Sequence, residues 1–175
     1  MSGGLLAFDL GMTIGITWGP WLTSVSASPP ALVVRAAEIL PGDYGYRFRC
    51  CENEIINALD EFEPDAVVKE APIAKNERTT QHVLRLHHGF HAHLEQNCSR
   101  RNIPCIEYSA DNVRNEVLGR CRRTKAEIKA NVTMKDIVQA GLLRMGYRVT
   151  NHNAADALAT YIYAVTKLDN HRRST

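Results

Sequence analysis

The stretch Leu5–Thr17 reads Leu-Leu-Ala-Phe-Asp-Leu-Gly-Met-Thr-Ile-Gly-Ile-Thr and places one carboxylate, Asp9, inside an apolar run. A short apolar run without a period of two predicts a central β-strand that is covered on both faces. An ionised carboxylate in such a strand costs several kcal/mol unless a cation or several donors face it. Asp9 is therefore a candidate metal ligand. The alternative is that Asp9 only supports a turn begun by Leu10 and Gly11, because Asp before Gly is common in turns.

The length and composition predict one domain of ordinary size. The chain has 175 residues, of which 45% are hydrophobic, and we expect a single domain over 1–170 with a flexible tail at 171–175. It has no signal-like N-terminal segment and no apolar run of the roughly 18–20 residues that span a bilayer. We therefore expect a soluble protein without a membrane partner, in the cytoplasm of a bacterial or phage-infected cell, with an organelle as the alternative.

The cysteines and histidines do not predict a zinc site or a disulfide framework. The five cysteines are odd in number and form no C-x-x-C motif, so we expect reduced thiols. Four histidines lie close together in the sequence without a cysteine or acidic partner at ligand spacing. These histidines are His87, His88, His91 and His93.

The charges are distributed unevenly along the chain. Residues 1–70 carry a net charge of −6 and residues 100–148 a net charge of +6, although the whole chain is only +2. A basic half beside an acidic site suits a polyanion held near a metal ion. The alternative is a solvated helix surface, which is what most charge runs are.

Hydrophobic periodicity and turn residues predict an α/β chain. We expect three antiparallel strands first, then alternating helices and strands, and helices at the end. The expected strands are Leu5–Gly11, Ile14–Pro20, Ala31–Leu40, Ala66–Val68 and Ile103–Tyr108. The expected helices are Tyr44–Phe62, Gln81–Asn97, a short one capped by Ser109 or Asp111 and ending at Leu118, one from the Thr124/Glu127 capping box to about Leu143, and Asn151 to about Leu168.

Two more carboxylates stand where they could join Asp9. Glu70 ends the short apolar strand 66–68, just before Ala71 and Pro72. Asp156 lies in the last helix with Asn153 three residues before it, so both side chains can approach one ligand.

A basic segment precedes the helix that we expect from Thr124. The segment Arg120–Lys125 has four cations in six residues, at Arg120, Arg122, Arg123 and Lys125. Amides at a helix N-terminus and basic side chains both attract phosphates, so this segment is a candidate phosphate-binding site.

The element order resembles the ribonuclease H-like fold, and particular residues resemble the RuvC-type Holliday junction resolvases. Phe8-Asp9-Leu10-Gly11 is similar to the first acidic motif of this family. Val68-Lys69-Glu70 with Ala74-Lys75-Asn76 is similar to the second. Val113-Arg114, Val117-Leu118-Gly119 and Lys125 are similar to the third segment, and Ala154–Ala159 is similar to the terminal motif.

The resemblance implies an α/β ribonuclease H-like fold with a mixed five-stranded sheet, and a nuclease that resolves four-way DNA junctions. It implies that Asp9, Glu70 and Asp156 bind two Mg²⁺ ions, or Mn²⁺, roughly 4 Å apart. The family usually has a further ligand at the position of Asn153, which brings no charge, and His152 is next to it. It also implies that Lys125 and Arg114 contact phosphates.

The same resemblance implies how DNA and a second subunit are bound. The loop after Glu70 would meet the junction through Lys75, Asn76 and Arg78, with Ile73 where many members have an aromatic wedge. Symmetric cleavage implies a homodimer, for which the helix 81–97, with Leu84, Phe90 and its histidines, is a candidate surface.

Three other functions remain open from the sequence. One is a less selective nuclease of this fold that cuts flaps, forks or RNA–DNA hybrids. Another is a junction-binding protein that has lost catalysis, which Asn153 keeps possible. The third is an actin-like ATPase or sugar kinase, because the turn at 9–13 resembles their phosphate loop, but 175 residues are too few for the two domains that these need.

Overall fold

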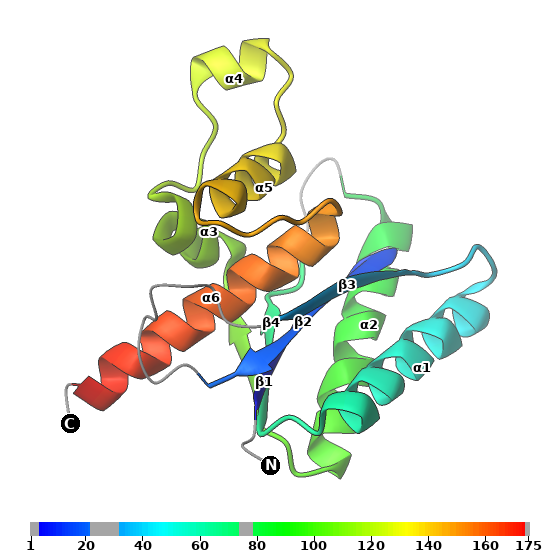
Figure 1. The fold of residues 1–175 in the computed structure, drawn as a ribbon. Coiled ribbons are helices and arrows are strands. Elements are labelled where there is room, and N and C mark those ends of the chain that lie inside the picture. The colour runs from blue at the N-terminus through cyan, green and yellow to red at the C-terminus, as the bar shows by residue number, and fades with distance from the viewer. Residues whose placement is uncertain (1–3, 22–31, 74–78, 174–175) are drawn as a thin grey trace.

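A computed structural model describes residues 4–21, 32–73 and 79–173, with the side chains of 169–173 excepted. Its elements follow one another as strands, then alternating helices and strands, then helices (Figure 1). They are β1 (Gly4–Asp9), β2 (Thr13–Pro20), β3 (Val33–Glu38), α1 (Tyr44–Phe62), β4 (Ala66–Glu70), α2 (Gln81–Arg100), β5 (Cys105–Tyr108), α3 (Ala110–Leu118), α4 (Lys125–Lys129), α5 (Met134–Arg144) and α6 (His152–Arg173).

The predicted mixed five-stranded sheet is confirmed, with the strand order β3-β2-β1-β4-β5. The pairs β1–β2 and β2–β3 are antiparallel, whereas β1–β4 and β4–β5 are parallel. Because β1 lies at the centre, it has a hydrogen-bonded neighbour on each side. The carboxyl ends of β1 and β4 therefore lie side by side at one edge of the sheet.

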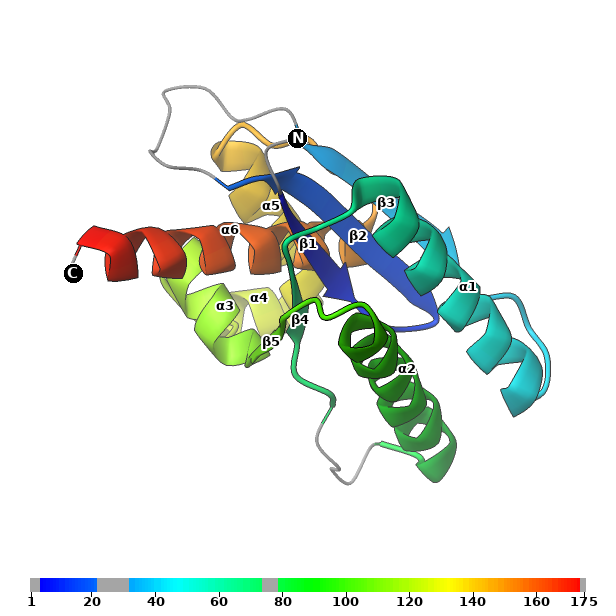
Figure 2. The same ribbon diagram turned by 90° about the horizontal axis from the view of Figure 1, so that it is seen from below.

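Helices cover both faces of the sheet, as Figure 2 shows. The helices α1 and α2 pack on one face, where Leu6 and Phe8 of β1 belong to the core. The helices α3, α5 and α6 pack on the other, where Leu5 and Ala7 belong to a second core. All four side chains are fully buried, as expected of a central strand with two covered faces.

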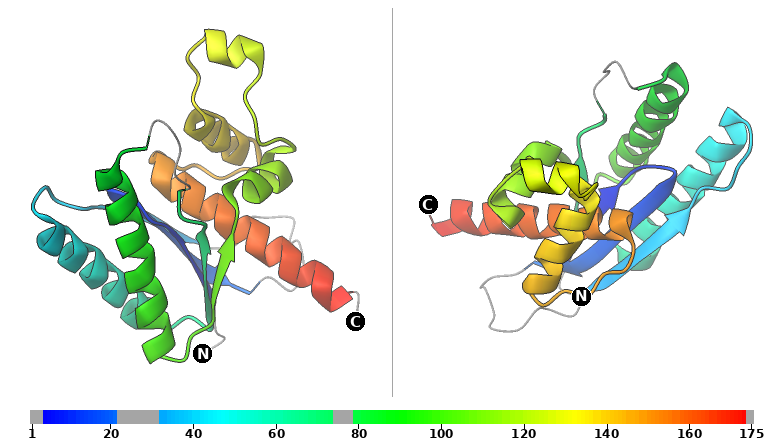
Figure 3. Two further views of the ribbon diagram at one scale, coloured as in Figure 1. Left: turned by 180° about the vertical axis from the view of Figure 1, so that it is seen from behind. Right: turned by 90° about the horizontal axis from the view of Figure 1, so that it is seen from above.

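The helix expected from Thr124 to about Leu143 is two helices, so that prediction was wrong. Asn131 has a φ of 55°, which ends α4 in a left-handed conformation. Thr133 then opens α5 with its own capping box to Asp136. The short helix α4 has no buried residue and projects beyond the rest of the fold (Figure 3).

Two other helices are longer than expected. The helix α2 continues to Arg100 rather than Asn97, and α6 continues to Arg173, past Leu168 and into the segment expected as a tail. Leu84 is 9% exposed and Phe90 is 1% exposed. Both lie in the interior, so they do not form the subunit surface that we expected of α2. Over the described ranges, no helix is both long and apolar enough to cross a membrane.

The start of α6 is pressed against β2 at Gly15. A Cβ atom at Gly15 would lie 1.9 Å from the backbone oxygen of Asn153. This close approach brings the first turn of α6, with Asn153 and Asp156, over the sheet edge where β1 ends.

We predict that Gly15→Ala destabilises the protein by about 3 kcal/mol, at the upper end of overpacking costs, because backbone rather than a flexible side chain must move. Urea denaturation measures this. Gly45→Ala is the matched control, since its Cβ would meet only Asp43 Oδ1 at 3.5 Å and alanine favours a helix. Equal stability of Gly15→Ala and the wild type would contradict the close contact.

Candidate active site

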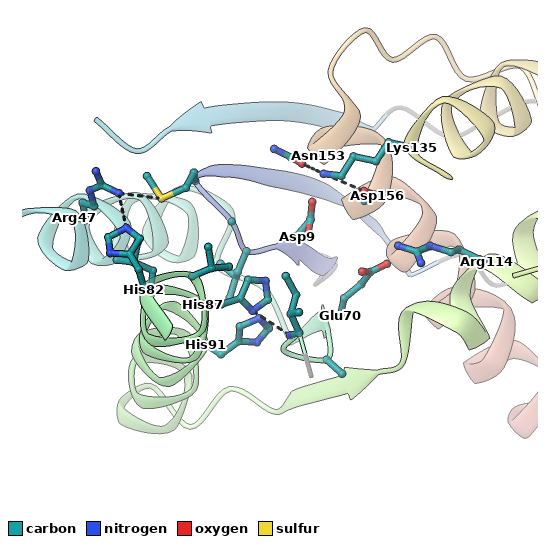
Figure 4. Close-up of a pocket in the computed structure, with 17 residues that line it drawn as sticks. Asp9, Arg47, Glu70, His82, His87, His91, Arg114, Lys135, Asn153 and Asp156 are labelled. Atoms are coloured by element: carbon teal, nitrogen blue, oxygen red, sulfur yellow. Dashed lines mark hydrogen bonds and ion pairs between the residues drawn. The ribbon is translucent and has the colours of Figure 1, made fainter. Parts of the chain in front are cut away.

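Three carboxylates from three elements meet at one edge of the sheet. Asp9 is the last residue of β1 and Glu70 the last residue of β4. The parallel register pairs Phe8 with Lys69, so Asp9 and Glu70 follow at the same level. Asp156 comes from the beginning of α6 and is 3% exposed. Figure 4 shows the three side chains around one space.

They line a cleft of about 410 Å³ together with cationic, imidazole and apolar side chains. Among the residues predicted from sequence, Asp9, Glu70, Asp156, Asn153, Arg114 and Ile73 all line this cleft. Its other lining residues include Met12, Arg47, His82, Val83, His87, His91 and Lys135.

Burial raises the pKa of each carboxylate, and repulsion by a neighbouring carboxylate adds to this at Asp9 and Glu70. Burial raises the pKa of Asp9 well above its usual value, and the charges of Asp156 and Glu70 raise it further. Burial, with the charge of Asp156, raises the pKa of Glu70 to about 7. Burial also raises the pKa of Asp156, although Lys135 and Arg114 oppose this. A cluster of this kind destabilises its own charged form, which favours a cation as ligand.

Lys135 is a site residue that the sequence motifs did not single out. Its ammonium group donates a hydrogen bond to Asn153 Oδ1 and lies 3.5 Å from Asp156 Oδ2. The signal in the sequence is the second capping box, Thr133/Asp136, which places Lys135 in the first turn of a helix. Because we expected one long helix, this turn was not recognised.

The donor set fits a hard divalent cation. Asp9, Glu70, Asp156 and Asn153 offer carboxylate and amide oxygens, which Mg²⁺ prefers over nitrogen or sulfur. Among the described residues, no three His, Cys, Asp or Glu side chains are gathered closely enough to hold a single metal ion. The carboxylates repel one another and the Lys135 ammonium already balances part of their charge, so binding of an ion would require small side-chain movements.

The basic segment before α4 lies outside the cleft. Arg120, Arg122, Arg123 and Lys125 are absent from its lining. Arg120 forms a two-point ion pair with Glu127, with one N–O distance of 2.7 Å, and Arg123 donates to the Val132 carbonyl.

Four other predicted residues lie elsewhere or outside the described ranges. His152 also does not line the cleft, and its Nε2 lies 3.2 Å from Asp136 Oδ1. Lys75, Asn76 and Arg78 fall in 74–78, outside the described residues.

A buried lysine fastens the strand that carries Glu70. Lys69 is 1% exposed, and its Nζ contacts Glu107, Glu95 at 3.1 Å and His91 Nδ1 at 3.2 Å. Burial lowers the pKa of Lys69, but the hydrogen bonds to Glu107 and Glu95 raise it more. These contacts tie β4 to β5 and α2, so the backbone that positions Glu70 is held from both sides.

Two histidines of α2 that line the cleft, His87 and His91, are neutral. Burial, with the charge of Lys69 among the causes, lowers the pKa of His91 to about 3 and that of His87 to about 4. The ammonium of Lys69 can only donate, so Nδ1 of His91 accepts and its Nε2 carries the proton. This Nε2 is buried and has no partner in the described structure.

Comparison with known proteins identifies the fold. No protein-family model matches the sequence, and no curated protein matches it either. Among solved structures, Thermus thermophilus RuvC matches with a TM-score of 0.68 and 17% identity, covering 98% of this chain and 97% of that one. The same RuvC in complex with a Holliday junction substrate gives a TM-score of 0.71 and 16% identity, covering 97% and 96%.

A mitochondrial protein matches as well. The yeast mitochondrial Holliday junction resolvase Ydc2 gives a TM-score of 0.54 and 13% identity, covering 98% of this chain and 82% of that one. The chain therefore has a RuvC-like fold over nearly its whole length, as the resemblance of its sequence motifs implied.

We predict that Glu70→Gln stabilises the protein at pH 8 by about 2–3 kcal/mol when no divalent ion is added. The pKa of Glu70 rises from 4.5 in the unfolded chain to about 7 in the fold. Below pH 4.5 the protonated Glu70 does not lower the free energy of unfolding. As the pH rises from 4.5 through about 7, the free energy of unfolding falls, because the charged form is disfavoured in the fold. Urea denaturation between pH 4.5 and pH 8 measures the effect.

The control is Glu38→Gln, which removes an exposed carboxylate at the end of β3. This control should change stability little at any pH. A Glu70→Gln variant that is no more stable than the wild type at pH 8 would show that Glu70 carries no electrostatic cost in the fold.

Proposed function

We propose that the protein is a metal-dependent endodeoxyribonuclease that resolves four-way DNA junctions, with residues 1–170 acting as one nuclease domain. The observation that carries the proposal is the meeting of Asp9, Glu70 and Asp156 in one cleft of a RuvC-like fold. One of the matched structures is a Holliday junction resolvase and another is RuvC in complex with a Holliday junction substrate, and the chemistry of the cleft agrees with such a substrate.

Asp9, Glu70 and Asp156, with Asn153, would hold two Mg²⁺ ions, and Mn²⁺ is the alternative. When bound, the ions supply an activated water and stabilisation of the leaving oxygen. The chain itself supplies the framework, because β1 and β4 fix two carboxylates and α6 fixes the third. Since His152 does not line the cleft, we favour Asn153 as the fourth ligand.

Arg114 and Lys135 would bind the phosphate that is cut. Both line the cleft beside the carboxylates, and Nε of Arg114 is buried without a partner among the described residues. A buried donor without an acceptor costs free energy, which a phosphate oxygen would remove. Lys135 therefore takes the role that the sequence suggested for Lys125.

The basic segment before α4 would contact DNA away from the cut. Arg122 and Lys125 are exposed and lie beyond the cleft, on the part of the fold that projects furthest (Figure 3). Arg120 and Arg123 would bind phosphates only by sharing or releasing their present partners. These contacts would position the DNA arms without selecting a sequence.

Ile73 and its loop would meet the centre of the junction. Ile73 is 42% exposed and lines the cleft, so its apolar side chain can insert beside an unstacked base. Lys75, Asn76 and Arg78 follow in the same loop, and we propose that they contact the junction. Cleavage of two strands also calls for two sites, so we propose a homodimer with an isologous interface.

A less selective nuclease of the same fold is the second candidate. It is favoured by Asn153, which makes the ligand set less negative than the pattern of the family, and by Ile73, which is a weaker wedge than an aromatic ring. Cleavage of four-way, flap and RNA–DNA hybrid substrates side by side separates the two functions. Preference for the hybrid would contradict junction resolution.

We predict that Asp9→Asn lowers Mg²⁺-dependent junction cleavage by about a thousandfold, since a metal ligand supports several kcal/mol of transition-state stabilisation. Junction binding should stay within about twofold of the wild type. Single-turnover cleavage and a gel-shift assay measure the two effects. Asp60→Asn, on the outer surface of α1, is the control and should cleave normally. Normal cleavage by Asp9→Asn would remove Asp9 from the site.

We predict that Lys135→Ala slows single-turnover cleavage by about tenfold or more, because Lys135 lies beside Asp156 and Asn153. Lys125→Ala should instead leave the single-turnover rate at saturation unchanged and lower the salt dependence of binding by about one ion. Cleavage at saturating DNA and binding from 50 to 200 mM salt separate the two roles. If instead Lys125→Ala slows cleavage and Lys135→Ala changes only the salt dependence of binding, Lys125 would be the lysine of the catalytic site.

A further inference from the structure

A second cationic cluster lies at the end of the cleft opposite Arg114. It consists of Tyr44, Arg47, His82 and Arg85, from the first turns of α1 and α2, and we call it the Arg47 cluster. Arg47 and His82 line the same cleft as the carboxylates. Figure 4 shows them at one end, Arg114 at the other, and the carboxylates between.

The side chains of the Arg47 cluster hold one another in place. Arg47 Nε donates to the Gly42 carbonyl at 2.9 Å, and its Nη1 lies 3.5 Å from His82 Nε2. His82 Nδ1 is 2.8 Å from the hydroxyl oxygen of Tyr44. The Arg85 guanidinium lies over the Tyr44 ring, 4.1 Å from its centroid. The two guanidinium groups are therefore positioned before any ligand arrives, which lowers the entropic cost of binding one.

Arg47 and Arg85 form no salt bridge with an acidic side chain among the described residues, whereas Arg35, Arg101 and Arg120 do. Arg35 pairs with Glu61 and Arg101 with Asp60, each through a carboxylate. A guanidinium has five N–H donors, and Arg47 and Arg85 use few of theirs on the fold. Arg47 lines the cleft, and Arg85 lies beside it over Tyr44. Two fixed cations with unused donors in this position are suited to an anion with several acceptor oxygens.

Cations at both ends of an acidic cleft suit a ligand with more than one phosphate. Arg114 and Lys135 at one end are enough for a single phosphate beside the carboxylates. The Arg47 cluster is at the other end and belongs to the opposite helical layer, on α1 and α2. A mononucleotide or a strand that ends at the cut would leave it unused.

We infer that the Arg47 cluster binds a backbone phosphate of the strand that passes through the cleft, so that the cleft holds nucleotides on both sides of the phosphate between the carboxylates. The identity of this strand as DNA rests on the proposed function. The Arg47 cluster thus selects an internal position of a chain over its end. Arg47 and Arg85 are positioning residues, because they act on a phosphate other than the one that is cut.

The test compares Arg47→Gln and Arg85→Gln with Arg49→Gln. Arg49 is the matched control for Arg47, since it lies in the same helix and over a tyrosine ring, Tyr46, at 5.9 Å, but neither lines the cleft nor belongs to the Arg47 cluster. Binding of a fluorescent single-stranded 20-mer and of a four-way junction is measured without divalent ions from 50 to 200 mM salt. Thermal unfolding of each variant checks its fold.

We expect each cluster variant to bind about tenfold more weakly at the middle of this range and to lower the salt slope by about one ion, while Arg49→Gln matches the wild type. Arg47→Lys should restore the slope, because the charge returns, and only part of the affinity, because the planar group does not. A shorter single strand that does not reach the Arg47 cluster should bind the wild type and Arg47→Gln with the same affinity.

The outcomes separate this inference from the proposed function. If Arg47→Gln and Arg85→Gln behave as Arg49→Gln while the wild type cuts junctions, the inference is wrong and the proposed function stands. If the variants lose affinity and slope but no junction is cut by the wild type, the inference stands without the proposed function. A wild type that binds neither probe would overturn both.

Discussion

The repulsion between three carboxylates at the edge of one sheet is the constraint on which the rest of the structure depends. Burial disfavours the charge of Asp9, Glu70 and Asp156, and the charge of Asp156 raises the pKa of Asp9 and of Glu70 further. Only a rigid framework keeps such groups together. Parallel pairing of β1 with β4 fixes two of them, and the contact of Gly15 with the start of α6 fixes the third.

The buried charges around Lys69 are part of this framework. A lysine that is almost completely inaccessible on the strand of Glu70 is stabilised by Glu95, Glu107 and His91, which come from α2 and β5. Leaving any partner unpaired in such a place is costly. The network therefore resists movement of β4 relative to its neighbours, and the electrostatic strain at the sheet edge does not separate the strands.

Most of the fold could be predicted from the sequence, because its elements have strong local signals. The central strand was recognisable from its apolar run, and α1 was bounded by Asp43, which accepts from Tyr46, and by Pro64. The break between α4 and α5 was missed, since Asn131 in a left-handed conformation has no apolar pattern to mark it. The residues brought together from far apart were harder to predict. The acidic motifs led to the carboxylates, and the Thr133/Asp136 capping box could have pointed to Lys135. The Arg47 cluster follows only from packing.

The two walls of the cleft belong to different helical layers, and each layer has its own hydrophobic core. Arg47 and His82 extend from the layer of α1 and α2, whereas Lys135, Asn153 and Asp156 extend from the layer of α5 and α6. A ligand that contacts both walls stabilises the two layers against separation, since moving either layer away would break its contacts. Such a ligand binds the folded chain and not the unfolded one. Its binding free energy therefore adds to the free energy of unfolding of the whole domain, including both cores.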